Sequence, residues 1–149
     1  MQLKQQLYNH CHQHIKSSIA AAQNVINNAR EASQNETKSS AGDKYETGRE
    51  MMQQEIDMAM QRISELQKLK ASLDRIDPAL VSKKIQPGSV ALTSQGSYYI
   101  AISMGKTIIN GNVYYIISPA SPLGSKLIGT EAGDTIAFNG KEFTVNDVI

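Results

Sequence analysis

The sequence predicts an α+β protein in which a pair of long helices precedes a small β domain. Two observations lead to this fold class. Apolar residues recur every three or four positions through residues 1–76, which contain no proline. After residue 88 the pattern changes to short β-branched and aromatic runs separated by glycine and asparagine turns. We therefore expect a helical hairpin at 1–76, a linker at 77–88 and a compact domain at 89–149.

Each predicted helix carries one narrow apolar stripe. In the first helix the stripe steps by four residues with one step of three, through Leu3, Leu7, Cys11, Ile15, Ile19, Ala22 and Ile26. In the second helix the steps alternate between four and three, as in a heptad repeat, apart from one skipped position near Leu69. This stripe runs through Met52, Ile56, Ala59, Ile63, Leu66, Leu73 and Ile76. We expect the two stripes to bury each other in an antiparallel coiled-coil hairpin with its tip at about residues 33–44.

The second half has turn residues at the spacing expected between the strands of a small sheet. Asp77-Pro78 is expected to end the second helix, because proline disfavours helix in the residue before it. Strands are predicted at 89–92, 98–103, 112–117, 135–138 and 142–148, with hairpin turns at Asn110-Gly111 and Asn139-Gly140. One short helix is predicted between the third and fourth strands, with Ser121 as its N-cap and Pro122 in its first turn. Gly105-Lys106-Thr107 is predicted to be a turn, since it matches only the end of a phosphate-binding loop.

Composition excludes several function classes. The net charge is only +1, whereas electrostatic nucleic-acid binders usually show a marked basic excess. The one cysteine, Cys11, cannot form an internal disulfide, which is typical of a reducing cytoplasm. The first residues lack the apolar run of a signal peptide, and no stretch approaches the length of a membrane span. We therefore expect a soluble cytoplasmic protein that does not bind membranes.

One segment of the second half carries a specific motif. Residues 117–134 read ISPASPLGSKLIGTEAGD, and residues 143–148 read FTVNDV. These segments resemble the signature and last strand of the Gre transcript-cleavage factors. In the first half, ARE at 29–31, KYE at 44–46 and ISEL at 63–66 fall where that family has similar residues. The resemblance covers nearly the whole chain and implies an FKBP-like fold for the β domain.

The resemblance also implies a function. A factor of this kind modulates transcription elongation by binding bacterial RNA polymerase at its secondary channel, with the β domain at the rim and the hairpin inside. The docking role, against a coiled coil of the polymerase β′ subunit, carries over to Ser121, Pro122 and Leu123. The RNA 3′ end is then an indirect partner. Such a protein is not itself an enzyme and at most stimulates hydrolysis by the polymerase. A simpler interpretation is that Ser121 and Pro122 only begin a helix.

The tip departs from the family pattern. Cleavage factors of this family use two tip acids that help to hold a second Mg²⁺, shared with the polymerase active site, and no cofactor of their own. Aligning Tyr45 with the family's tyrosine puts Lys38 and Ala41 at the positions of those acids. The nearest acids, and hence the candidate catalytic residues, are Glu36 and Asp43. The other tip residues that we single out are Lys38, Lys44, Tyr45 and Glu46.

Other interpretations of the tip remain open. Ser40 and Asp43 fit a capping box that begins the second helix, in which case Asp43 is structural. The protein would then be a non-cleaving channel regulator, with Lys38 and Lys44 facing phosphates or acidic walls. A third possibility is a coiled-coil interaction module unrelated to transcription.

A histidine-rich stretch precedes the middle of the first helix. His10 and His14 have a workable two-ligand spacing, but Zn²⁺ takes three or four ligands and no second cluster of Cys or His exists. Cys11 lies on the apolar stripe, which favours burial over reactivity. We therefore expect no intrinsic metal site. We also expect a monomer, because two paired stripes would leave little apolar surface exposed.

Overall fold

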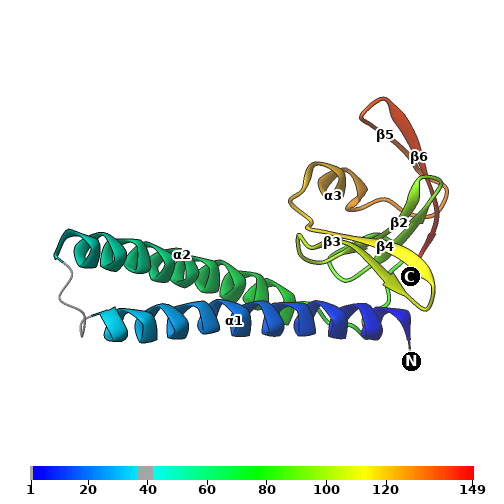
Figure 1. The fold of residues 1–149 in the computed structure, drawn as a ribbon. Coiled ribbons are helices and arrows are strands. Elements are labelled where there is room, and N and C mark those ends of the chain that lie inside the picture. Colours follow the sequence, from blue (N-terminus) through cyan, green and yellow to red (C-terminus); the bar gives the residue numbers. More distant parts are fainter. Residues whose placement is uncertain (1, 37–41) are drawn as a thin grey trace. The chain divides into compact units, whose positions relative to one another are not determined.

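The structure is a computed structural model that describes residues 2–36 and 42–149, without the side chains of residues 35–46. It is an α+β fold in which two long helices, α1 (Leu3–Glu36) and α2 (Gly42–Asp74), precede a mixed six-stranded sheet (Figure 1). The chain divides into two compact units. We call residues 13–70 the helix-pair unit, and residues 1–12 with 71–149 the sheet unit. Among the described helices, none combines the length and apolarity that crossing a bilayer requires.

In the helix-pair unit, α1 and α2 lie side by side and bury the parts of the predicted stripes that fall in this unit (Figure 1). Leu3, Leu7 and Cys11 of the first stripe belong to the sheet unit instead. Their contact is made largely of small and β-branched side chains: Ala22, Ile26 and Ala29 from α1, and Ile56 and Ala59 from α2. Met52 and Ile63 cover the edges of this cluster. The 4–3 spacing therefore predicted correctly which faces of the two helices meet.

The sheet unit contains six strands and one short helix. The strands are β1 (Val90–Thr93), β2 (Gly96–Ile100), β3 (Gly105–Ile109), β4 (Asn112–Ile117), β5 (Thr135–Phe138) and β6 (Lys141–Val148), and the helix is α3 (Pro122–Leu127). Their order in the sheet is β3-β4-β2-β1-β6-β5. All neighbours are antiparallel except β2 and β4, which pair in parallel with Tyr98 opposite Tyr115.

Two tight turns have the predicted chemistry. Asn110 and Gly111 both adopt positive φ values, 52° and 82°, and join β3 to β4. Asn139 and Gly140, at 50° and 74°, join β5 to β6. This geometry matches the right-handed twist of the flanking strands and explains why Asn-Gly is favoured there.

One local prediction was wrong. Gly105-Lys106-Thr107 does not form a turn but begins β3, which pairs with β4 from Gly105 opposite Ile116 to Ile109 opposite Asn112. The short segment gives a weak strand signal by itself. Its conformation is fixed by the ladder with β4 and by contact with α1, both of which are non-local.

The sheet is covered on both faces within this unit. A cluster formed by α3 and several strands includes Ile85, Ala91, Ile100, Leu123, Leu127, Phe143 and Val145. On the other face the first turns of α1 pack on the strands. His10 Nε2 lies 2.8 Å from Thr107 Oγ1, and Asn110 donates to Gln6 Oε1 at 3.2 Å. Tyr99 is fully buried beside Cys11 and Tyr8.

Candidate functional site

The segment that runs from the end of β4 into the first turn of α3, residues 118–124, is tightly hydrogen-bonded. We call it the loop at Ser121. Ser121 is the N-cap of α3, with an extended backbone at φ −64° and ψ 157°. Its Oγ accepts from the backbone N–H of Gly124 at 3.0 Å and donates to the carbonyl of Ser118 at 2.7 Å. Pro122 follows, where the missing N–H costs nothing and the fixed φ suits the helix. The sequence prediction of this cap is confirmed.

Gly124 fixes the shape of the same loop. A Cβ at this position would lie 2.1 Å from the carbonyl oxygen of Ser118 and 2.7 Å from Ser121 Oγ. The loop carbonyl therefore approaches the helix backbone more closely than any other residue type allows. Four positions of the run Ser-x-x-Ser-Pro-Leu-Gly thus have a physical reason: Ser121 caps the helix, Pro122 is its first residue, Leu123 anchors it in the core, and Gly124 permits the close approach. Ser118 contributes its backbone carbonyl.

The side chain of Leu123 faces the core, whereas that of Pro122 faces solvent. Leu123 is 9% exposed and belongs to the core cluster with Leu127, whereas Pro122 is exposed. Of the three predicted docking residues, Pro122 offers surface, Ser121 is half-buried and shapes the loop, and Leu123 anchors it. The exposed side chains of Ala120 and Ser125 flank Pro122 in sequence.

The far end of α3 is tied to β5. Lys126 donates its ammonium to the carbonyl of Ala137 at 2.7 Å and lies 5.9 Å from the centre of the Phe138 ring. This contact was missed from the sequence, since nothing local links Lys126 to the fourth predicted strand. It holds α3 against the edge of the sheet from the end opposite to Ser121.

The predicted tip residues fall at the ends of the two long helices. Glu36 is the last residue of α1, and α2 begins at Gly42, with Asp43, Lys44, Tyr45 and Glu46 in its first turns. Lys38, Ala41 and the proposed cap Ser40 lie outside the described residues, as do the side chains of Glu36 and the four α2 residues. The pairing of Glu36 with Asp43 and the capping box therefore stay predictions.

A polar groove lies beside the described part of the helices that lead to the tip. It has a volume of about 320 Å³ and is lined by Arg30 and Ser33 of α1 and by Arg49 and Gln53 of α2, among others. Both arginines are exposed. The ion pairs His12–Asp74 and Arg62–Glu65 involve neither arginine, and neither has an acidic partner among the side chains that the structure describes. Two guanidinium groups beside one groove suit an anionic group such as a phosphate.

His10 and His12 have structural partners, His14 is exposed, and Cys11 is buried. His10 contacts Thr107, and His12 lies 3.5 Å from Asp74 and packs edge-on against Tyr8. Among residues 2–34 and 47–149, whose side chains the structure describes, no three His, Cys, Asp or Glu side chains gather as a metal site would need. Burial raises the pKa of the Cys11 thiol to about 12, so the thiol stays protonated and is a poor nucleophile.

In comparisons with known proteins, no protein-family model and no curated protein matches the chain. The features that carry chemical meaning are thus the capped loop at Ser121, the arginine groove and the helix ends.

Proposed function

We propose that this protein binds bacterial RNA polymerase at its secondary channel and modulates transcription elongation, as the Gre factors do. In this proposal the sheet unit is an FKBP-like docking domain and α1 and α2 form an antiparallel coiled coil. The order of two long paired helices followed by a small mixed sheet supports it, as does the run at 117–134.

The observation that carries the proposal is the loop at Ser121 and Pro122. A docking surface needs a shape that is fixed before binding, because ordering a flexible loop reduces the affinity. Here the loop is held by two hydrogen bonds of Ser121, by the close approach at Gly124 and by the buried Leu123. Pro122 is left exposed on this rigid support. We assign Pro122 to the contact with the β′ coiled coil, with Ser121 and Leu123 as positioning residues.

The helix-pair unit would supply the residues that act near the polymerase active site. Arg30 and Arg49, which line one groove, would contact phosphates of the RNA or acidic walls of the channel. If the factor stimulates cleavage, Glu36 and Asp43 are the residues that would share a Mg²⁺ with the polymerase, which in turn would activate the attacking water. Hydrolysis would remain the reaction of the polymerase, and this chain would supply ligands and position.

A non-cleaving channel regulator is the second candidate. The observation that favours it is the presence of Lys38 and Ala41 at the positions where the family has its acids. Such a factor would act by occupying the channel, and the arginine groove would serve equally well in it.

Binding is tested by sedimentation of the protein with core RNA polymerase. We expect Pro122→Glu to abolish co-sedimentation, because an acid in the first turn suits the helix but removes the apolar contact. Ala132→Glu is the matched control: it adds the same charge at an exposed position outside α3 and should bind normally. Equal binding by wild type and Pro122→Glu would remove the docking assignment.

Cleavage is tested on backtracked elongation complexes with Mg²⁺. Shortening of the RNA from its 3′ end, lost in the Glu36→Ala, Asp43→Ala variant, would establish a cleavage factor. Unshortened RNA in complexes that contain the bound protein would establish the non-cleaving regulator.

A further inference from the structure

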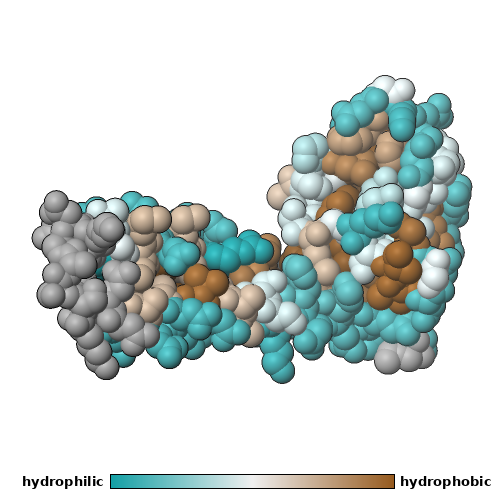
Figure 2. All heavy atoms as spheres, in the orientation of Figure 1, coloured by the Kyte–Doolittle hydropathy of each residue, from teal (hydrophilic) through white to brown (hydrophobic). Residues whose placement is uncertain are grey.

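The helix-pair unit has a second apolar surface, which borders the buried stripes and shares Ala22 and Ala59 with them. A groove of about 510 Å³ runs between α1 and α2 and is lined by Ser18, Ala21, Ala22, Val25, Glu55, Met58, Ala59 and Arg62. Most of these side chains are small or apolar. Figure 2 shows hydrophobic colouring on this unit among hydrophilic neighbours.

The large apolar side chains of this surface are unusually exposed. Met58 is 72% exposed, Met51 is 63% exposed and Val25 is 43% exposed. Positions 51 and 58 are two helical turns apart, so both methionines lie on one side of α2. The expectation of a monomer rested on a paired hairpin leaving little apolar surface, and that premise does not hold for the described residues.

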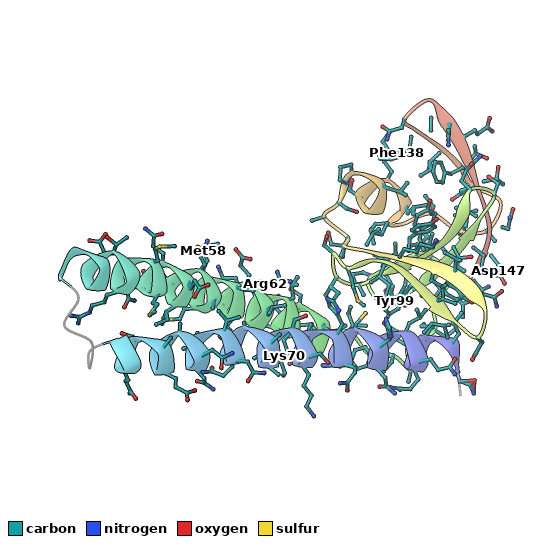
Figure 3. The ribbon with its side chains drawn as sticks, viewed as in Figure 1. Met58, Arg62, Lys70, Tyr99, Phe138 and Asp147 are labelled. Atoms are coloured by element: carbon teal, nitrogen blue, oxygen red, sulfur yellow. The ribbon has the colours of Figure 1, made fainter. Side chains whose placement is uncertain are left out.

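The charges around this surface are arranged symmetrically about its centre. Glu55 lies three residues before Met58, and Arg62 lies four residues after it, so all three fall on one face of α2. Figure 3 labels Met58 and Arg62 on the same side of the helix. The midpoint between Glu55 and Arg62 falls between Met58 and Ala59. The only described acid that pairs with Arg62 is Glu65, at a long 3.9 Å and with both side chains about half-exposed, so this pair is weak.

We propose that, in the protein not bound to polymerase, this groove is the interface of a homodimer in which α2 packs antiparallel against α2 of a second copy. A two-fold axis through the midpoint places Glu55 of each copy opposite Arg62 of the other. It also sets each Met58 over the floor of small residues, Ala21, Ala22 and Ala59, of its partner. An isologous interface must be self-complementary, and the Glu55 and Arg62 arrangement of this surface meets that condition for charge. A different protein would match such symmetry only by coincidence.

Reversing one charge tests the symmetry directly. In a dimer of Glu55→Arg, each new arginine faces Arg62, and in a dimer of Arg62→Glu, two pairs of glutamates meet. Either variant alone should therefore raise the dimer dissociation constant at least about tenfold, which corresponds to ~1.4 kcal/mol. A mixture of the two variants restores both opposite-charge pairs, so the mixed sample should form heterodimers as tight as the wild-type dimer.

Analytical ultracentrifugation of the full chain over a concentration series measures this, with circular dichroism as the check that each variant folds. Glu50→Arg and Lys68→Glu are matched controls, since both are exposed charges on other faces of α2, and both should dimerise like the wild type. Met58→Ser should weaken the dimer without changing its charge. A wild-type protein that stays monomeric at every concentration would overturn the proposal. Dimerisation of both single reversals at wild-type strength, or no association in their mixture, would overturn the two-fold arrangement.

Discussion

Residues 3–12 and 13–34 of α1 share one apolar stripe but are buried to very different extents. In the first stretch every residue except Asn9 is buried or half-buried. In the second, nearly every residue off the stripe is exposed. The first stretch packs on the sheet, and the second packs on α2. A sheet covers a wider sector of a helix than a second helix does. The same apolar period therefore gives a wide contact between residues 3–12 and the sheet, which we call the broad contact, and a narrow contact between residues 13–34 and α2.

The broad contact also takes in polar groups. Lys4 is 8% exposed and donates its ammonium to the carbonyl of Leu80. Burial lowers the pKa of Lys4, and the nearby Asp77 opposes that shift. Thr107 is buried in contact with His10. Apolar periodicity therefore locates the centre of a helix contact, whereas its width depends on what packs there.

The largest expected difference in the free energy of unfolding is between leucine truncations in the two units. Leu7 and Leu66 are both fully buried, Leu7 in the sheet unit and Leu66 in the helix-pair unit. We expect Leu7→Ala to cost about 4 kcal/mol and Leu66→Ala about 2–3 kcal/mol, because a helix pair can close around a cavity more easily than a sheet. Urea unfolding, with hydrogen exchange resolved for each unit, measures both. Equal or reversed costs would contradict the difference in packing.

Alkaline pH should weaken the broad contact next. Burial raises the pKa of Cys11 from 9.0 to about 12, and that of Tyr99 is raised by burial, then by Cys11 and Tyr8. The folded state therefore holds protons that the unfolded state loses. The stability is fully present below pH 9 and falls between pH 9 and 12, by up to about 1.4 kcal/mol per pH unit for one group.

Thermal unfolding from pH 7 to 11 tests this dependence. Cys11→Ala should flatten the fall at its lower end, where the thiol of the unfolded chain titrates first. An unchanged pH profile in that variant would exclude the thiol as its source.

A smaller loss of stability is expected when a side-chain hydrogen bond is removed, and it should differ between the two stretches of α1. Thr107→Val keeps the shape of a buried side chain but removes its 2.8 Å contact with His10, and should cost about 1 kcal/mol. Ser17→Ala removes an exposed hydrogen bond from Gln13 in the helix-pair unit and should cost almost nothing. Denaturant midpoints of the two variants suffice for the comparison. A larger loss in Ser17→Ala would reverse our assignment of strength.

The smallest effect concerns Tyr99. Its hydroxyl is buried and has no hydrogen-bond partner among the residues that the structure describes. Tyr99→Phe should therefore change the free energy of unfolding by less than about 0.5 kcal/mol, or stabilise the protein slightly. A loss of 1 kcal/mol or more would show that a bound water satisfies this hydroxyl.

Local signals predicted much of this fold. The stripes of both helices, the Asn-Gly turns and the cap at Ser121 follow from side-chain chemistry within a few residues, and each is confirmed. Strand β3 was missed because its pairing with β4 and its contact with α1 are not visible in Gly105-Lys106-Thr107. The parallel pairing of β2 with β4 likewise has no local signature.

In the candidate site, too, some features could be predicted from adjacent residues and others depend on distant segments. Ser121 and Pro122 were recognisable because capping depends on adjacent residues. The inward direction of Leu123 and the contact of Lys126 with β5 depend on packing between distant segments. The arginine groove was missed because Arg30 and Arg49 come together only when α1 and α2 pair. The relation between Glu36 and Asp43 is non-local as well, which is why spacing alone left it open.

The placement of the first turns of α1 has a consequence for how the chain folds during synthesis. His10 and its partner Thr107 are separated by 97 positions. The residues of α1 and α2 that form the helix-pair unit are all translated before the strands, so that unit can assemble on the ribosome. The start of α1 must wait, with Leu7 and Cys11 uncovered, until β4 has emerged, and β1 waits longer for β6. The sheet unit is therefore the last part to close and the part whose exposed surface a chaperone would meet.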